Sequence, residues 1–302
     1  MIDSTRLRAL NARLSVALAA PPGVYVPLSV DRHCVGWTDP ARASRLAQFS
    51  DVFTQSHEGL AFVRGLDDEP SRTAGLGHVT RALADEGLLS AWRDETYTIA
   101  SAWGAPALFL LERAAARYFG VVTYAAHING LVAHSHEMHM WFARRSATKA
   151  IDPGQLDTLV GGGIRSGTSV EETVLREAWE EAGIHAATAA RALPTGAVRV
   201  CRAGADGLQR EIIFVHDLAL DPRFAPNNID GEAVEHRLVT IDKAAEMIAR
   251  SEGCDLVTVD ASLVVLDYLL RSGSLSPRSP DYLALAALRW SPLCPGQRSA
   301  RA

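Results

Sequence analysis

One stretch, residues 161–184, constrains the rest of the chain most strongly: three successive glycines lead into a single amphipathic helix. Thr168 or Ser169 is placed to cap that helix, and Gly183 is placed to end it. At about 100° per residue, the apolar and acidic side chains of the helix separate onto opposite faces. The apolar face must therefore pack on a core, while the acidic face is left for another purpose.

The acidic face carries Glu177, Glu180 and Glu181 at spacings of i, i+3 and i+4, so their carboxylates converge. Crowded carboxylates repel one another unless a cation lies between them. Hard divalent cations such as Mg²⁺, or Mn²⁺, prefer such oxygen ligands. A cation held there would bind a diphosphate and help to generate a nucleophilic water. The three glutamates are therefore predicted to be metal ligands and catalytic residues.

The same stretch resembles the Nudix box, G-x5-E-x7-R-E-U-x-E-E-x-G-U, where U is a bulky apolar residue. The matching residues, in a single register, are Gly162, Arg176, Glu177, Glu180, Glu181, Gly183 and Ile184. Two positions depart, because Thr168 replaces the first glutamate and Ala178 replaces the first U. The alternative is a solvated surface helix. Such a helix would alternate Glu with Lys, and this one has no Lys.

The resemblance implies the fold class α/β (α+β), with a Nudix α/β/α sandwich around a mixed sheet. It implies a Mg²⁺- or Mn²⁺-dependent hydrolase that acts on a small-molecule diphosphate. The backbone carbonyl of Gly162 is a candidate fourth metal ligand, although the glycines also suit a tight strand-to-helix loop. Arg176, within the catalytic motif, is expected to brace Glu180 rather than to touch substrate.

Similarity beyond the box looks like one Nudix branch, in which an extra N-terminal domain precedes a portion similar to the Nudix part fused to thiamine pyrophosphokinase. It is carried by residues 111–115, 119–120, 127–130, 141–146, 153–157 and 159–163, with 230–232 and 280–287 downstream. In that branch the first glutamate of the box is commonly absent, as at Thr168. The resemblance implies hydrolysis of thiamine diphosphate derivatives, especially oxidised, damaged forms, to the monophosphate and phosphate. A nucleotide-linked diphosphate such as ADP-ribose is the second candidate.

Thr168 cannot supply a carboxylate charge, so a non-catalytic ligand-binding module stays open as a different class of function. Isomerisation of a prenyl diphosphate, also known on this fold, needs a paired Cys and Glu, and no Cys stands near the box. A compensating acid is expected from Glu232 or Glu235, which otherwise are solvated loop acids.

Arg144, Arg145 and Lys149 are candidates for binding the substrate phosphates, since arginine forks match phosphate geometry. Ordinary surface charge explains them equally well. The histidines of residues 134–139 resemble a metal cluster, but they fall between two predicted strands. A solvated hairpin turn is the preferred interpretation.

A composition shift near residue 118 predicts three parts: a small α+β N-terminal domain (1–118), the Nudix domain (119–250), and C-terminal helices and a tail that pack on it (251–302). Residues 1–20 follow helical spacing. Helices are also expected over 88–93 and 108–118. The dipeptide Asn129-Gly130 predicts a turn.

Composition limits the classes of partner that the chain is expected to bind. A net charge of −5 without a basic stripe argues against nucleic acid. No apolar run approaches the roughly 18 residues of a membrane span. The cysteines, at positions 34, 201, 254 and 294, form no C-x-x-C, which favours reduced thiols in a cytoplasmic protein. A homodimer is left open.

Overall fold

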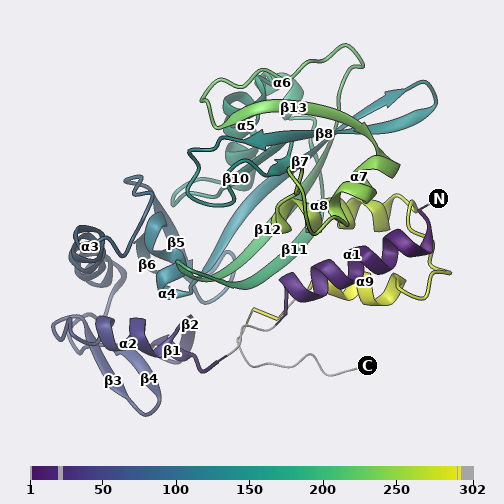
Figure 1. Ribbon diagram of the computed structural model, residues 1–302. Coiled ribbons are helices and arrows are strands. Elements are labelled where there is room, and N and C mark those ends of the chain that lie inside the picture. The colour runs from purple at the N-terminus through teal and green to yellow at the C-terminus, as the bar shows by residue number, and fades with distance from the viewer. Residues whose placement is uncertain (1, 20–22, 291, 294–302) are drawn as a thin grey trace.

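The computed structural model of the protein describes residues 2–19, 23–290 and 292–293, so Cys294 lies outside the described residues. Within this part of the chain, a seven-stranded mixed sheet forms the centre of the molecule (Figure 1). Its main path runs β11–β12–β7–β8–β13, while β10 pairs with β7 and β9 with β8. Only β12 and β7 run parallel among these pairs. The strands are β7 (Val122–His134), β8 (Glu137–Arg145), β9 (Leu156–Thr158), β10 (Val160–Gly163), β11 (Leu193–Gly204), β12 (Gly207–Ala219) and β13 (Ala233–Thr240).

Helices cover both faces of this sheet because its strands are apolar on both sides. Successive residues of β7 point to opposite faces. Ala126 packs in the core that includes Ala178 of α5 (Val170–Ala182). Ala125 packs in the opposite core, with Leu263 of α8 (Val259–Arg271). Short helices α6 (Ala186–Ala189) and α7 (Ile241–Ile248) complete the two layers. The predicted α/β/α sandwich around a mixed sheet is thus confirmed.

The first helix, α1 (Ser4–Ala17), packs on the C-terminal helices rather than on the rest of the N-terminal part (Figure 1). Its buried stripe of Leu7, Leu10 and Leu14 shares a core with α7, α8 and α9 (Tyr282–Leu288). Arg13 donates to the backbone carbonyls of Ile248 and Val257. Residues 2–19 and 23–118 therefore divide between two cores, although the sequence predicts that the N-terminal part forms one unit.

The remaining N-terminal residues form a separate α+β unit with its own core. A four-stranded sheet in the order β2–β1–β4–β3 packs with helices, and a separate two-stranded hairpin contacts both this unit and β7 of the large sheet. The elements are β1 (Val26–Val30), β2 (His33–Thr38), α2 (Pro40–Leu46), β3 (Phe53–Ser56), β4 (Gly59–Phe62), α3 (Glu69–Asp85), β5 (Thr96–Ala100) and β6 (Ala107–Glu112).

The helix predicted over 108–118 is wrong for its first half. Residues 107–112 form β6, antiparallel to β5, and only η1 (Arg113–Ala115) and α4 (Ala116–Phe119) are helical. Phe109 and Leu111 are fully buried while Leu110 between them is less so, which is the period of a strand. Apolar residues on both faces hide that period in the sequence. The helix predicted over 88–93 is also wrong, because this segment is irregular.

The turn predicted at Asn129-Gly130 is wrong as well, since both residues lie inside β7 and pair with β12. Asn129 is fully buried, and its amide donates to Asp217 Oδ1 at 2.9 Å. The chain instead turns at Ser135 and His136, which have φ angles of 49° and 69°. The solvated hairpin expected for residues 134–139 is therefore confirmed. No helix in the described part of the chain has the length and apolarity needed to cross a bilayer.

Candidate active site

The acidic helix α5 is placed by its caps and by the strand before it. Ser169, not Thr168, is the N-cap, and it exchanges hydrogen bonds with Glu172 in a capping box. Gly183 ends the helix with a φ of 64°. The three glycines before the helix form strand β10 rather than a loop. The carboxylates of α5 therefore lie against a strand of the sheet.

The glycines of β10 are required by close approach, since none of the three has a positive φ. A Cβ on Gly162 would lie 2.0 Å from Glu177 Oε1. A Cβ on Gly163 would lie 2.0 Å from the hydroxyl oxygen of Tyr97, which belongs to β5. The glycine strand thus holds a catalytic candidate on one side and the N-terminal unit on the other.

Glu177 and Glu181 are acids in a low-dielectric setting. Burial and the charge of Glu177 raise the pKa of Glu181 to about 8, against the effect of the Gly161 amide, which donates to it at 2.8 Å. Burial also raises the pKa of Glu177, against the effect of Arg176. A cation beside this pair would offset their repulsion.

Arg176 braces the acidic face of the helix. Its guanidinium lies 2.6 Å from Glu177 Oε1 and donates to Glu180 Oε2 at 2.9 Å. As these side chains stand, no three His, Cys, Asp or Glu residues converge on a point where they would hold an ion, among residues 2–19, 23–290 and 292–293. The donors nevertheless suit Mg²⁺ or Mn²⁺ in kind, because Glu177, Glu180, Glu181 and the Gly162 carbonyl offer only oxygen.

Of the two extra acids predicted, the structure brings one to the site. Glu232 lines a small cavity beside Gly161 and Glu181. It contacts Lys149 and lies 2.9 Å from Arg93 Nη1. Glu235 instead belongs to β13 and pairs with arginines at positions 144 and 237.

Of the three predicted phosphate ligands, the structure brings two to the pocket. Arg144 lies outside the pocket, and its guanidinium is engaged by Glu235 at 2.7 Å and Asp255 at 2.5 Å. Arg145 lines the pocket but donates to Asp157 at 2.9 Å and to the carbonyl of Ile151. Lys149 also lines the pocket, and burial lowers its pKa to about 8, against the attraction of Glu181.

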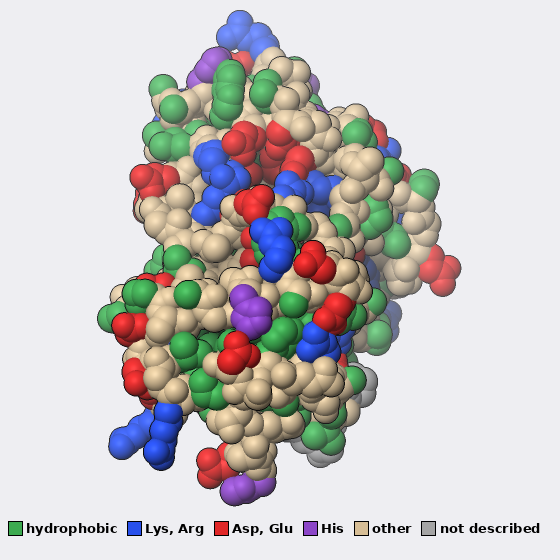
Figure 2. Space-filling model, turned by 90° about the vertical axis from the view of Figure 1, so that its left-hand side faces the viewer, with side chains coloured by type: hydrophobic (Ala, Val, Ile, Leu, Met, Phe, Trp, Pro, Cys, Tyr) green, Lys and Arg blue, Asp and Glu red, His purple; other side chains and the backbone are tan. Residues whose placement is uncertain are grey.

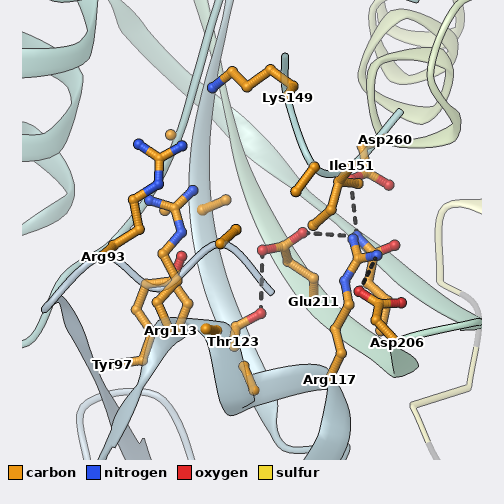
Figure 3. A pocket seen from close by; sticks show the side chains of 18 of the residues that line it. Arg93, Tyr97, Arg113, Arg117, Thr123, Lys149, Ile151, Asp206, Glu211 and Asp260 are labelled. Carbon is orange, nitrogen blue, oxygen red and sulfur yellow. Dashed lines mark hydrogen bonds and ion pairs between the residues drawn. The ribbon is translucent and has the colours of Figure 1, made fainter. Parts of the chain in front are cut away.

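A pocket of about 190 Å³ lies against the glycine strand (Figure 3). The sheet supplies Thr123, His127 and Glu211, and the N-terminal unit supplies Arg93 and Arg113. On the side of the molecule turned to the left in Figure 1, acidic side chains gather between basic ones (Figure 2). Sequence reasoning missed the N-terminal wall. Residues 111–115 carry part of the family resemblance, but no chemical motif marks the arginines of this wall, and they meet the glycine strand only through folding.

The charges of the pocket are unevenly distributed (Figure 3). Arg93, Arg113 and Lys149 lie on one side, and Glu211 and Asp260 lie on the other, where Arg117 pairs with Asp206 at 3.2 Å. Burial raises the pKa of Glu211, and the nearby Asp260 raises it further. Gln209 bridges the two acids, donating at 3.0 Å and 2.9 Å. The second oxygen of Asp260, Oδ1, is buried and has no hydrogen-bond partner among the described residues.

Comparison with known proteins identifies two matching family models. Residues 17–123 match "Domain of unknown function (DUF4743)", and residues 124–254 match "NUDIX domain". The boundary between them falls within β7.

Relatives in Arabidopsis thaliana match both parts. The chain is 36% identical over 265 residues to "Nudix hydrolase 24, chloroplastic", spanning 87% of this chain and 72% of that protein. It is 34% identical over 272 residues to "Nudix hydrolase 20, chloroplastic", with the same shares. A solved MutT protein from Methanosarcina mazei Go1 is similar with 19% identity and a TM-score of 0.38, over 51% of this chain and 96% of that one.

Proposed function

The chain belongs to the Nudix hydrolase family, and on that premise we propose that it is a Mg²⁺- or Mn²⁺-dependent pyrophosphohydrolase. Its proposed substrate is a thiamine diphosphate derivative, in particular an oxidised form, which it cleaves to the monophosphate and phosphate. The observation that carries this proposal is the uneven charge of the pocket on β10. We propose that the side with Arg93, Arg113 and Lys149 takes the diphosphate and that the side with Glu211 and Asp260 takes the ring system.

The carboxylate of Glu181 lines a small cavity that shares Arg145, Lys149 and Gly161 with the pocket, so the acids of α5 adjoin the proposed diphosphate site. A divalent cation held by Glu177, Glu180, Glu181 and the Gly162 carbonyl would neutralise the diphosphate and lower the pKa of a water. Glu181, whose carboxylate is held against the glycine strand by the amide of Gly161, is the proposed acceptor of that water's proton. The water oxygen bonds to the terminal phosphorus, and the bridging P–O bond breaks. The monophosphate and phosphate are then released.

The acidic end of the pocket supports the choice of ring. Glu211 and Asp260 together offer acceptor oxygens, one of them without a partner in the described structure. Thiamine compounds carry an aminopyrimidine, whose amino group donates hydrogen bonds, and the unoxidised forms also carry a positive thiazolium. ADP-ribose also offers an amino group, so it stays the second candidate.

The test is phosphate release from oxothiamine diphosphate and thiamine diphosphate, and AMP release from ADP-ribose, each with and without Mg²⁺. We expect Mg²⁺-dependent turnover of the thiamine compounds that falls by about 100-fold or more in Glu181→Gln. Glu171→Gln is the matched control, because Glu171 is an exposed acid of the same helix.

Each other outcome has a definite meaning. Turnover of ADP-ribose alone would keep the hydrolase and reject the thiamine substrate. Absence of turnover with every substrate would instead favour the ligand-binding module, with Thr168 as the lost acid.

A further inference from the structure

Two arginines of the N-terminal unit, Arg93 and Arg113, face the pocket from outside the Nudix domain (Figure 3). We propose that they bind the phosphates of the substrate, so that the substrate site is built jointly by the Nudix domain and the N-terminal unit. This inference rests on the proposed diphosphate chemistry, but it does not depend on which ring the substrate carries.

A buried carboxylate fixes both arginines in place. Glu112, which is 7% exposed, accepts hydrogen bonds from the backbone amides of Arg93 at 3.3 Å and Glu95 at 3.2 Å. It also accepts from the amide of Ala114 at 3.3 Å, directly after Arg113. One side chain thus ties the loop that carries Arg93 to the strand end that carries Arg113.

The loop before β5 adopts an unusual backbone. Ala91 and Asp94 have φ angles of 59° and 53°, a region that residues other than glycine seldom occupy. Such a conformation persists only where surrounding contacts hold it. Here the indole of Trp92 donates to Asp94 Oδ1 at 2.7 Å, and the amides on both sides of Asp94 reach Glu112. The segment is therefore held in the shape that presents Arg93 to the pocket.

The hairpin is also joined directly to the catalytic stretch. The amide of Ser166 donates to the carbonyl of Thr96 at 2.8 Å. Glu95 lies 2.9 Å from Arg165, in the segment between β10 and α5, and 3.2 Å from Arg113. Together with the Tyr97 hydroxyl against Gly163, these contacts set the position of Arg113 relative to the glycine strand.

Both arginines retain the capacity to bind an anion. Their side chains are 42% and 35% exposed, at positions 93 and 113 respectively, so a ligand can reach them. A guanidinium donates in a planar fork that matches phosphate oxygens. The carboxylate of Glu232 already lies between Arg93 and Lys149, which shows that an anionic group fits between these two cations.

The experiment measures binding of methylenediphosphonate, a diphosphate mimic that is not hydrolysed, to the full chain with Mg²⁺ by calorimetry. We expect Arg93→Gln and Arg113→Gln each to weaken binding by about tenfold or more, because each removes a charged hydrogen bond. Arg113→Lys keeps the charge but not the fork, so its loss is expected to be smaller. Arg64→Gln is the control, since Arg64 is an exposed arginine of the same unit outside the pocket.

The outcomes separate this inference from the proposed function. Weakened binding in the pocket variants supports the composite site even if no thiamine compound is turned over. Wild-type affinity in both Gln variants, or no binding of the mimic to the wild-type protein, overturns it. If Arg113→Gln does not fold, Arg93→Gln and Arg113→Lys decide the result, with melting temperatures as the check on folding.

Discussion

Two walls flank the glycine strand, one on each side, and they are built in different ways. The wall formed by α5 is acidic, and its ion pairs are local: Arg176 contacts Glu177 next to it and Glu180 one turn on. The wall formed by the N-terminal unit is basic, and its contacts span the chain. Arg93, for example, pairs with Glu232, which lies 139 residues away.

The difference in burial matches a difference in task. The side chain of Glu177 is 10% exposed, whereas those of Arg93 and Arg113 are about four times more open to solvent. Acids that are to hold a cation and move a proton must be placed rigidly and kept from bulk water. Arginines that capture an anion arriving from solvent must stay accessible. Damage to the acidic wall should therefore impair the chemical step, and damage to the basic wall should impair binding.

The largest expected effect comes from a substitution in the glycine strand that displaces the carboxylate of Glu177 in the acidic wall. In Gly162→Ala the new Cβ would lie 2.0 Å from Glu177 Oε1, so the carboxylate must move. We expect kcat to fall by about 100-fold, since displacement by about 1 Å suffices for such a loss. Steady-state kinetics measure it. Gly77→Ala, in α3 with open space around it, is the control and should keep wild-type kcat.

The second prediction breaks the basic wall through Glu112. Glu112→Gln weakens the acceptor of three backbone amides, so we expect a loss of about 1–3 kcal/mol in the free energy of unfolding. The KM should rise with little change in kcat, because Arg93 and Arg113 lose their common anchor. Denaturant unfolding and kinetics test both parts. Glu86→Gln, an exposed acid paired with Arg45, should change neither. A fall in kcat at constant KM would contradict the division between the walls.

The third prediction concerns the far end of the pocket and its pH dependence. The pKa of Glu211 is raised above its usual 4.5, chiefly by burial. The folded state therefore holds this proton to a higher pH than the unfolded state does. Stability from this group is full below pH 4.5 and is lost as pH rises through the folded pKa. We expect Glu211→Gln to melt at a higher temperature than wild type at pH 8 and at a similar one near pH 4. A difference in melting temperature between the variant and wild type that stays the same from pH 4 to pH 8 would refute this prediction.

The smallest expected effect concerns Thr168, which stands at the position of the first glutamate of the Nudix box. Thr168 Oγ1 donates to the carbonyl of Arg165 at 2.8 Å, just before the cap of α5. Thr168→Glu adds a carboxylate at the position of the first box glutamate, so we expect activity to saturate at a severalfold lower Mg²⁺ concentration. Titration of kcat with Mg²⁺ measures this. Thr168→Gln, which has the same shape without the charge, should titrate like wild type.

Local reasoning recovered what depends on local spacing. The contact between Arg176 and Glu180 spans four residues, and the acidic face of α5 repeats with the 3.6-residue period of a helix. Short-range patterns are therefore enough to predict both. Patterns that depend on burial gave wrong predictions. Residues 107–112 are apolar on both faces and so look helical, although they pair with β5. Asn129-Gly130 looks like a turn, although it is an interior part of β7 held by Asp217.

By itself the sequence determined the family, the sandwich fold and the acids of α5, because each follows from periodicity or from a dense motif. Only the tertiary structure decided which other charges reach those acids. Arg144 and Lys149 are near neighbours in sequence, yet one ties β8 to β13 and the other lines the pocket. Arg93 and Arg113 reach the glycine strand only because Glu112, Tyr97 and Glu95 hold the hairpin against it. Such contacts join residues far apart in the chain, and no local pattern records them.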